Sequence, residues 1–354
     1  MRLGKLRQAM AELGLDAIVI SRPENLRYLS GFTGGEGHLV ITADQALVAT
    51  DFRYYDQVGR ESQGWTLAKM NEGFEKLMPQ LLPDLRVQRV GFEGQVVTYE
   101  QHRKWSESIT GCQWVSTSDV VEKIRSQKDA GELAAIRQAV AVADAALDHV
   151  MGLIKPGMTE RAVGWELEAH MRTHGAENVS FNFIIASGPN AALPHAVTSD
   201  RAIQSGEPIT IDMGAKVAGY CSDMTRTFCL GQPRDDTFMK VWNTVFEAQQ
   251  AACRAIRAGM SGVDAHQVAQ KIIDDAGYGE YFGHGLGHGV GLAIHEKPRM
   301  SRLSQDTLAV GDVVTVEPGI YLPGWGGVRI EDMGVITEKG LDIFTESAKI
   351  AIVS

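Results

Sequence analysis

Short apolar runs alternate with helical patterns over the first 120 or so residues of the chain. Residues 3–13 and 72–82 carry apolar side chains at helical spacing, which predicts two helices. Short apolar runs separated by Gly, Pro or Asp predict strands at 17–21, 38–42, 46–50 and 89–93. This alternation is typical of a sheet covered by helices.

A longer helical pattern begins after this region. Ser126 and Asp129 have the spacing of a capping box, and the alanine-rich segment that follows favours a helix to about Ile154. Thr159 can cap a second helix, which Gly175 ends. Because the pattern changes where the long helix starts, we place a domain boundary there.

Two strand pairs with two helices between them account for much of the second half. The pattern predicts strands at 209–215, 221–230, 313–322 and 328–337. A turn near Gly219 joins the first pair, and helices follow at 237–257 and 263–276. Ser261 can cap the second of these helices. A glycine-rich stretch, 283–291, precedes the second strand pair.

Composition narrows the class of protein. The 354 residues include 34 Lys and Arg and 44 Asp and Glu, which gives a net charge of −10. Binding to phosphates needs a basic face, so we expect no nucleic-acid partner. No segment approaches the ~20 apolar residues that span a bilayer, so we expect no membrane partner. The four cysteines form no C-x-x-C pair and indicate reduced thiols of a cytoplasmic protein. The length predicts two domains, and the start of the long helical pattern divides them into 1–124 and 125–354.

Each predicted strand pair in the second half carries two acidic residues in apolar sequence. Asp212 and Asp223 lie in the first pair, and Glu317 and Glu331 in the second. A lone acidic residue in such a place more often faces water or caps a turn. Four buried carboxylates would repel one another, and burial without a partner is costly. If the two pairs face each other, two divalent cations would cancel the four charges, which favours a two-metal site.

Histidines follow one another closely in and after the glycine-rich stretch. His284, His288 and His295 lie there, and a flexible loop with solvated histidines is the simplest interpretation. Alternate glycines, however, would let imidazoles crowd around a small site. One imidazole added to several carboxylates suits Mn, Co, Zn or Fe more than Ca. His195, in a predicted loop after a strand, gives little indication of function by itself.

Taken together, these motifs resemble the pita-bread metallopeptidase family (M24), and within it the prolidase and aminopeptidase P branch. The resemblance extends over nearly the whole chain. It implies an α+β fold with a creatinase-like N-terminal α/β domain followed by a pita-bread catalytic domain. The five metal-ligand positions of that family are all filled and in order, by Asp212, Asp223, His288, Glu317 and Glu331.

The resemblance also implies an activity. It predicts a dinuclear-metal exopeptidase that hydrolyses the Xaa-Pro bond at the amino end of peptides or dipeptides, as a homodimer. Two divalent ions per subunit would hold an attacking hydroxide between them, with manganese the expected metal and cobalt or zinc the alternatives. Asp223 and Glu331 would bridge both ions, and Glu317 would shuttle a proton from the water to the leaving nitrogen.

Five further residues take substrate-side or supporting roles in the resemblance. His195 and His295 would steady the carbonyl oxygen and the tetrahedral intermediate, and His284 would lie near the pocket for the residue after the cleaved bond. Arg329 would orient ligand carboxylates. Arg299 could bind the carboxylate of a dipeptide, but aminopeptidases of this branch can carry it too, so both enzyme types stay open.

Two other interpretations use the same fold. A creatinase-like hydrolase works without metal, and a non-catalytic binding protein needs no reacting groups. Both are expected to have lost metal-ligand positions, whereas this chain retains all five. Fold likeness alone does not fix function, so both stay as alternatives.

Overall fold

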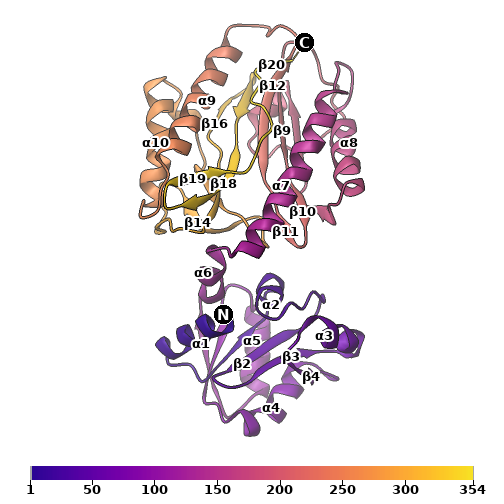
Figure 1. Cartoon of the computed structure of the whole chain (residues 1–354), viewed down its shortest axis with the longest axis vertical. Helices are drawn as coiled ribbons and strands as arrows, with labels where there is room; N and C mark the ends of the chain where they lie inside the picture. Colours follow the sequence, from indigo (N-terminus) through magenta and orange to yellow (C-terminus); the bar gives the residue numbers. More distant parts are fainter. Residues whose placement is uncertain (1, 354) are drawn as a thin grey trace. The chain divides into compact units, whose positions relative to one another are not determined.

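The computed structural model describes residues 2–353, which form two compact units, one up to Arg125 and one from Ser126 (Figure 1). The first unit is built on a mixed six-stranded sheet in the order β4-β3-β2-β1-β5-β6. Its strands are β1 (Ala17–Ile20), β2 (His38–Thr42), β3 (Ala46–Thr50), β4 (Thr66–Lys69), β5 (Arg89–Glu93) and β6 (Gln113–Thr117). The four predicted strands are confirmed as β1, β2, β3 and β5, and the prediction missed β4 and β6.

Six α-helices lie within residues 2–126. They are α1 (Arg2–Glu12), α2 (Pro23–Ser30), α3 (Tyr55–Glu61), α4 (Phe74–Leu85), α5 (Tyr99–Ser108) and α6 (Val120–Ser126). The predicted helices at 3–13 and 72–82 are confirmed as α1 and α4, within a few residues. Val19 and Val90 of the sheet pack in one apolar cluster with Met78 of α4 and Trp105 of α5, so these two helices close the core of the unit.

The predicted helix from Ser126 to Ile154 is wrong at its beginning. Ser126 ends α6, and the long helix α7 covers only Ala130–Met151. Its N-cap is Asp129, which forms a capping box with Glu132. Residues between the helices are extended because Gln127 forms a β-bridge with Asp312. The backbone therefore pairs with a distant segment where the sequence pattern predicts a helical turn.

The second unit consists of two similar halves, each combining two helices with strands. In Figure 1, α7 and α8 (Glu160–Thr173) lie on one side of the strands, and α9 (Thr237–Ala255) and α10 (Gly262–Asp275) lie on the other. One apolar cluster joins α7 and α8 to the first group of strands, and another joins α9 and α10 to the second group. Ser261 caps α10 through the amide of Asp264, as predicted.

The strands of the second unit form four sheets. One has the order β20-β12-β9-β8, a second β14-β13-β15-β18-β19, a third β11-β10-β7, and β16 and β17 pair with each other. The bounds are β7 (Asn178–Val179), β8 (Ile184–Ser187), β9 (Pro208–Met213), β10 (Ala215–Val217), β11 (Tyr220–Cys221), β12 (Met224–Leu230), β13 (Gly287–Gly289), β14 (Glu296–Met300), β15 (Val313–Val316), β16 (Gly319–Leu322), β17 (Gly326–Arg329), β18 (Asp332–Thr337), β19 (Gly340–Ile343) and β20 (Ile352–Val353).

Both predicted strand pairs form antiparallel pairs, but each predicted strand is broken into two. The strand β9 pairs with β12, and β15 pairs with β18, while the outer pieces pair separately as β10–β11 and β16–β17. Gly219 has a φ of 81° in the turn between β10 and β11, which glycine adopts without strain. Glu331 lies at the break before β18, and its amide donates to the carbonyl of Thr225 at 3.0 Å. The breaks therefore let one hairpin bond to the other.

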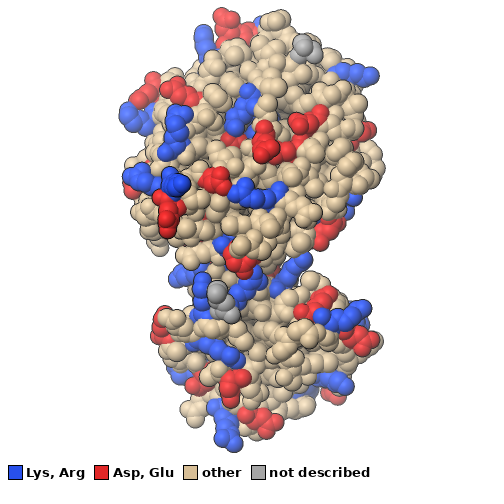
Figure 2. All heavy atoms as spheres, viewed as in Figure 1, with Lys and Arg blue, Asp and Glu red and all other residues tan. Residues whose placement is uncertain are grey.

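Charged side chains are distributed over both units. Figure 2 shows Lys and Arg interspersed with Asp and Glu on the visible face of each unit, rather than gathered in blocks of one sign. Among residues 2–353, none of the helices has both the length and the apolar character needed to cross a bilayer.

Candidate metal centre

Three carboxylates from different strands meet in the second unit. Asp212 lies in β9, Asp223 directly precedes β12, and Glu331 directly precedes β18. All three are buried, and one oxygen of each lies within 4.8 Å of the other two. The acidic residues of the two predicted strand pairs therefore do gather at one place.

Glu317 and His288 complete this group. The Nε2 atom of His288, on β13, lies 3.3 Å from Oε1 of Glu317 and 3.6 Å from Oδ2 of Asp223. The Nδ1 atom lies 3.0 Å from the carbonyl oxygen of Gly289, so Nδ1–H donates there and Nε2 keeps its lone pair. Burial, with a smaller effect of His295, lowers the pKa of His288 to about 3. The neutral ring thus presents a lone pair to the carboxylates.

Burial also perturbs the acidic side chains. It raises the pKa of Asp223 and of Glu331 well above their usual values, and the neighbouring carboxylates raise both further. For Glu317, burial is again the first cause, and its pKa rises to about 8. Without a cation, these groups hold protons that the same groups lose readily in water.

The donor set fits divalent cations. One oxygen of Asp212, Oδ2, accepts from Arg329, whereas the buried Oδ1 has no hydrogen-bond partner among residues 2–353. A buried acceptor without a donor needs an explanation, and an ion is one that also relieves the mutual repulsion of the acids. Several carboxylate oxygens with one imidazole nitrogen suit Mn, Co, Zn or Fe.

A buried arginine orients the cluster. The Nη2 atom of Arg329 donates to Oδ2 of Asp212 at 2.7 Å, and its Nε donates to Oγ1 of Thr225 at 3.1 Å. Thr225 in turn donates to Oε2 of Glu331 at 2.6 Å. One guanidinium therefore positions two carboxylates, one directly and one through Thr225. The sequence had indicated Arg329 but not Thr225, which looks like an ordinary strand residue.

The same arginine reaches a histidine through Tyr321. Its Nη1 donates to the Tyr321 hydroxyl at 2.8 Å, and that hydroxyl lies 2.9 Å from Nε2 of His284. Nδ1 of His284 lies 2.8 Å from the carbonyl oxygen of Gly285, so Nε2 accepts the tyrosine proton. Burial lowers the pKa of His284 to about 4, which agrees with a neutral ring. Tyr321 carries no signal in the sequence, because tyrosine is common in strands.

A cavity of about 600 Å³ opens on the acidic cluster. Every substrate-side residue suggested by the sequence lines it: His195, His284, His295, Arg299 and Arg329. His195, His295 and Arg299 are exposed, whereas Arg329 is buried. The His288 and His295 rings lie edge to face with centroids 4.4 Å apart. The cavity is therefore lined both by the carboxylates of the cluster and by imidazole and guanidinium groups.

Comparison with known proteins identifies the family. Residues 134–338 match the model of metallopeptidase family M24. The chain belongs to metallopeptidase family M24. Residues 2–127 match the creatinase/prolidase N-terminal domain, so the predicted combination of a creatinase-like domain with an M24 catalytic domain is confirmed.

The M24 relatives cover the chain from end to end. It is 41% identical over 353 residues to the uncharacterized peptidase YqhT of Bacillus subtilis, with 100% of each chain covered. It is similar to the structure of an Xaa-Pro dipeptidase from Bacillus anthracis, with a TM-score of 0.95, 40% identity and 99% of each chain covered. An X-Pro aminopeptidase from Thermotoga maritima has a TM-score of 0.89 and 36% identity, covering 98% of this chain and all of its own.

Proposed function

We propose that this M24 protein is an Xaa-Pro exopeptidase, which hydrolyses the bond before a proline in the second position of a peptide. The observation that carries the proposal is the convergence of Asp212, Asp223 and Glu331, with His288 and Glu317 beside them, on one cavity. Similarity over the whole chain to an Xaa-Pro dipeptidase and an X-Pro aminopeptidase supports the substrate class.

The converging side chains would hold two divalent ions, with manganese expected and cobalt or zinc as alternatives. The residues concerned are Asp212, Asp223, His288, Glu317 and Glu331. When bound, such ions polarise a carbonyl and lower the pKa of water. The neutral His288 ring and the unpaired oxygen of Asp212 are available for this purpose without breaking any existing bond to a protein donor.

The remaining side chains would bind the peptide and move its protons. A peptide bond to proline has no N–H to donate. A site that binds the carbonyl oxygen and protonates the ring nitrogen is therefore suited to hydrolysing this bond. Glu317 would take a proton from water and pass it to that nitrogen. His195 and His295 would donate hydrogen bonds to the carbonyl oxygen as it gains charge. The neutral ring of His284, fixed by Tyr321, would border the proline.

Arg299 is placed where it could bind the carboxylate of a dipeptide substrate. Its exposed side chain, on β14, lines the same cavity as the acidic cluster. A guanidinium binds a carboxylate strongly through bidentate hydrogen bonds, and in an Xaa-Pro dipeptide the proline carries the terminal carboxylate. We therefore propose dipeptidase activity, with aminopeptidase P activity as the alternative.

Comparing Ala-Pro with Ala-Pro-Ala under manganese tests this choice. We expect a higher kcat/KM for Ala-Pro in the wild type. Arg299→Ala is expected to lower kcat/KM for Ala-Pro about tenfold or more while changing that for Ala-Pro-Ala less than about twofold. A wild type that prefers the tripeptide would instead establish the aminopeptidase.

Chelation tests the metal requirement. Removal of metal is expected to abolish hydrolysis of Ala-Pro, and manganese or cobalt should restore it. Full activity in a metal-free sample would support the creatinase-like alternative. A manganese-loaded protein that hydrolyses no Xaa-Pro peptide would support a binding protein of the same fold.

We further propose that the enzyme is a cytoplasmic homodimer. None of the four cysteines forms a disulfide within residues 2–353, and three of them are buried, which suits a reducing compartment. The dimer is proposed from the family resemblance. Light scattering should give twice the chain mass of 38.5 kDa, and the single chain mass would refute the dimer.

A further inference from the structure

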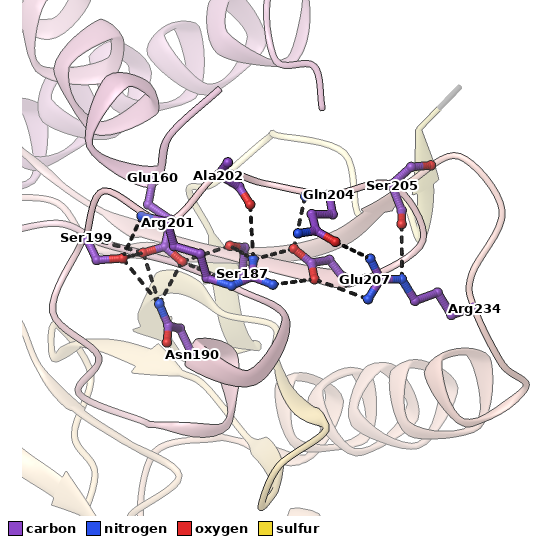
Figure 3. Close-up of polar contacts among 10 residues, drawn as sticks. All are labelled: Glu160, Ser187, Asn190, Ser199, Arg201, Ala202, Gln204, Ser205, Glu207 and Arg234. Carbon is purple, nitrogen blue, oxygen red and sulfur yellow. Dashed lines mark hydrogen bonds and ion pairs between the residues drawn. The ribbon is translucent and has the colours of Figure 1, made fainter. Parts of the chain in front are cut away.

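One buried carboxylate holds both ends of the loop 188–198 (Figure 3). Glu160, the first residue of α8, is fully buried. Its Oε1 accepts from the amide and the hydroxyl of Ser187, both at 2.8 Å. Its Oε2 accepts from the amide of Ser199 at 3.0 Å and from its hydroxyl at 2.6 Å. Nδ2 of Asn190, inside the loop, lies 3.1 and 3.2 Å from the two oxygens.

The charges around this carboxylate are balanced within the protein. Arg201 donates to the Ser187 hydroxyl at 2.6 Å and pairs with the buried Glu207 through both of its terminal nitrogens. Arg234 approaches Glu207 to 3.7 Å from the other side. Two acids thus face two arginines, as Figure 3 shows. The hydrogen bonds that Glu160 accepts come from the loop and the two residues that flank it, so the carboxylate fixes the backbone that it contacts.

The loop fixed in this way carries a residue of the cavity. His195 lines the cavity and is exposed, so the loop backbone rather than side-chain packing determines where its ring lies. Nearby, the carbonyl oxygen of Pro194 accepts from Nη1 of Arg329 at 3.3 Å. Arg329 also bonds to Asp212 of the acidic cluster. The loop is therefore held at its base by Glu160 and near His195 by the arginine that orients the cluster.

We propose that Glu160 is a positioning residue for the peptidase reaction, because it fixes the loop 188–198 so that His195 faces the peptide carbonyl. This inference rests on the proposed function. Glu160 is fully buried, so it acts through the loop and not on the peptide. Both of its oxygens are needed, since each accepts one of the two loop amides. A glutamine has a single acceptor oxygen and would leave Ser187 or Ser199 without an acceptor.

Glu160→Gln in the full-length, manganese-loaded protein tests the proposal. A matched control is Glu166→Gln, the same change on the same helix at a side chain that is 44% exposed. We expect Glu160→Gln to lower kcat for Ala-Pro about tenfold or more with KM changed less than about twofold, since small misplacements of a reacting group are costly. The control is expected to change neither constant.

A second background separates positioning from general destabilisation. In His195→Ala protein, Glu160→Gln is expected to lower kcat by less than about twofold, because the group that it positions is absent. An equal loss in both backgrounds, or no loss in the wild-type background, would overturn the proposal. If Glu160→Gln does not fold, Ser199→Ala, which removes one hydroxyl donor and keeps the backbone bond, is measured in the same two backgrounds with the same criterion.

Hydrogen exchange distinguishes failure of this inference from failure of the proposed function. A wild type that hydrolyses no Xaa-Pro peptide refutes the proposed function. Peptides covering 187–199 should exchange about tenfold faster in Glu160→Gln than in wild type, with no substrate present. Unchanged exchange there would overturn the role of Glu160 whatever the activity.

Discussion

Replacing Glu317 with glutamine should make the metal-free protein more stable at alkaline pH. Burial raises the pKa of Glu317 from 4.5 to about 8, so the folded protein holds this proton more tightly than the unfolded chain does. The resulting stability is fully present below about pH 4.5 and is lost as the pH rises through about 8. The whole difference amounts to roughly 5 kcal/mol, and a glutamine, which does not ionise, avoids the loss.

The assay must follow the second unit alone, because a protein of two units need not unfold in one step. Urea unfolding of metal-free wild type and Glu317→Gln, read by hydrogen exchange of peptides from β15 and β18, meets this need. Between pH 5 and 9 we expect the free energy of unfolding to fall for the wild type relative to the variant, by several kcal/mol at the alkaline end. Glu166→Gln, at a half-exposed side chain, should follow the wild type.

Parallel curves for wild type and Glu317→Gln would refute the reasoning. That result would mean that the Glu317 carboxyl is as well solvated in the folded protein as in the unfolded chain. Burial would then impose no cost on the ionised Glu317 that a cation could relieve. Manganese should also stabilise the wild type more at pH 8 than at pH 6. At pH 6 the metal must displace protons from the carboxylates, whereas at pH 8 more of these protons have already dissociated.

Three further substitutions separate the roles of the site residues. Glu331→Gln removes one charge from the cluster and is expected to lower kcat at least about 10³-fold and to reduce the bound metal, measured by kinetics and elemental analysis; wild-type turnover would contradict this. Arg329→Lys removes the guanidinium that donates to both Asp212 and Thr225. It should weaken manganese binding, measured by calorimetry, about 10- to 100-fold. His295→Ala should lower kcat about 100-fold with metal content unchanged, and a parallel loss of metal would assign it to the ions instead.

The sequence predicted elements well where local patterning and tertiary packing agree. The predicted strands at 38–42 and 46–50 are β2 and β3 residue for residue. The acidic cluster could also be anticipated, because Asp212 and Glu331 are out of place in β-branched sequence and each has a counterpart in its own strand pair. What the pattern could not give is the break in each strand, which depends on bonds such as that from Glu331 to Thr225 in the other hairpin.

Sequence patterns do not reveal the role of a residue that acts through partners far along the chain. Glu160 follows the N-cap Thr159 and so resembles any acidic residue in a first helical turn, where the helix dipole favours it. Its actual partners, Ser187 and Ser199, lie 27 and 39 residues away. The start of α7 was misplaced for a similar reason, since the extended Gln127 forms a β-bridge with Asp312, far along the chain.

Metal stoichiometry tests the central claim most directly. The protein would be stripped by chelation, loaded with manganese, freed of excess metal and analysed for bound ions per chain, with the variant Asp212→Asn/Glu331→Gln alongside. The account predicts two ions per wild-type chain, none retained in the double variant, and hydrolysis of Ala-Pro only in the loaded wild type. A wild-type chain that retains no ion and still hydrolyses Ala-Pro would contradict it.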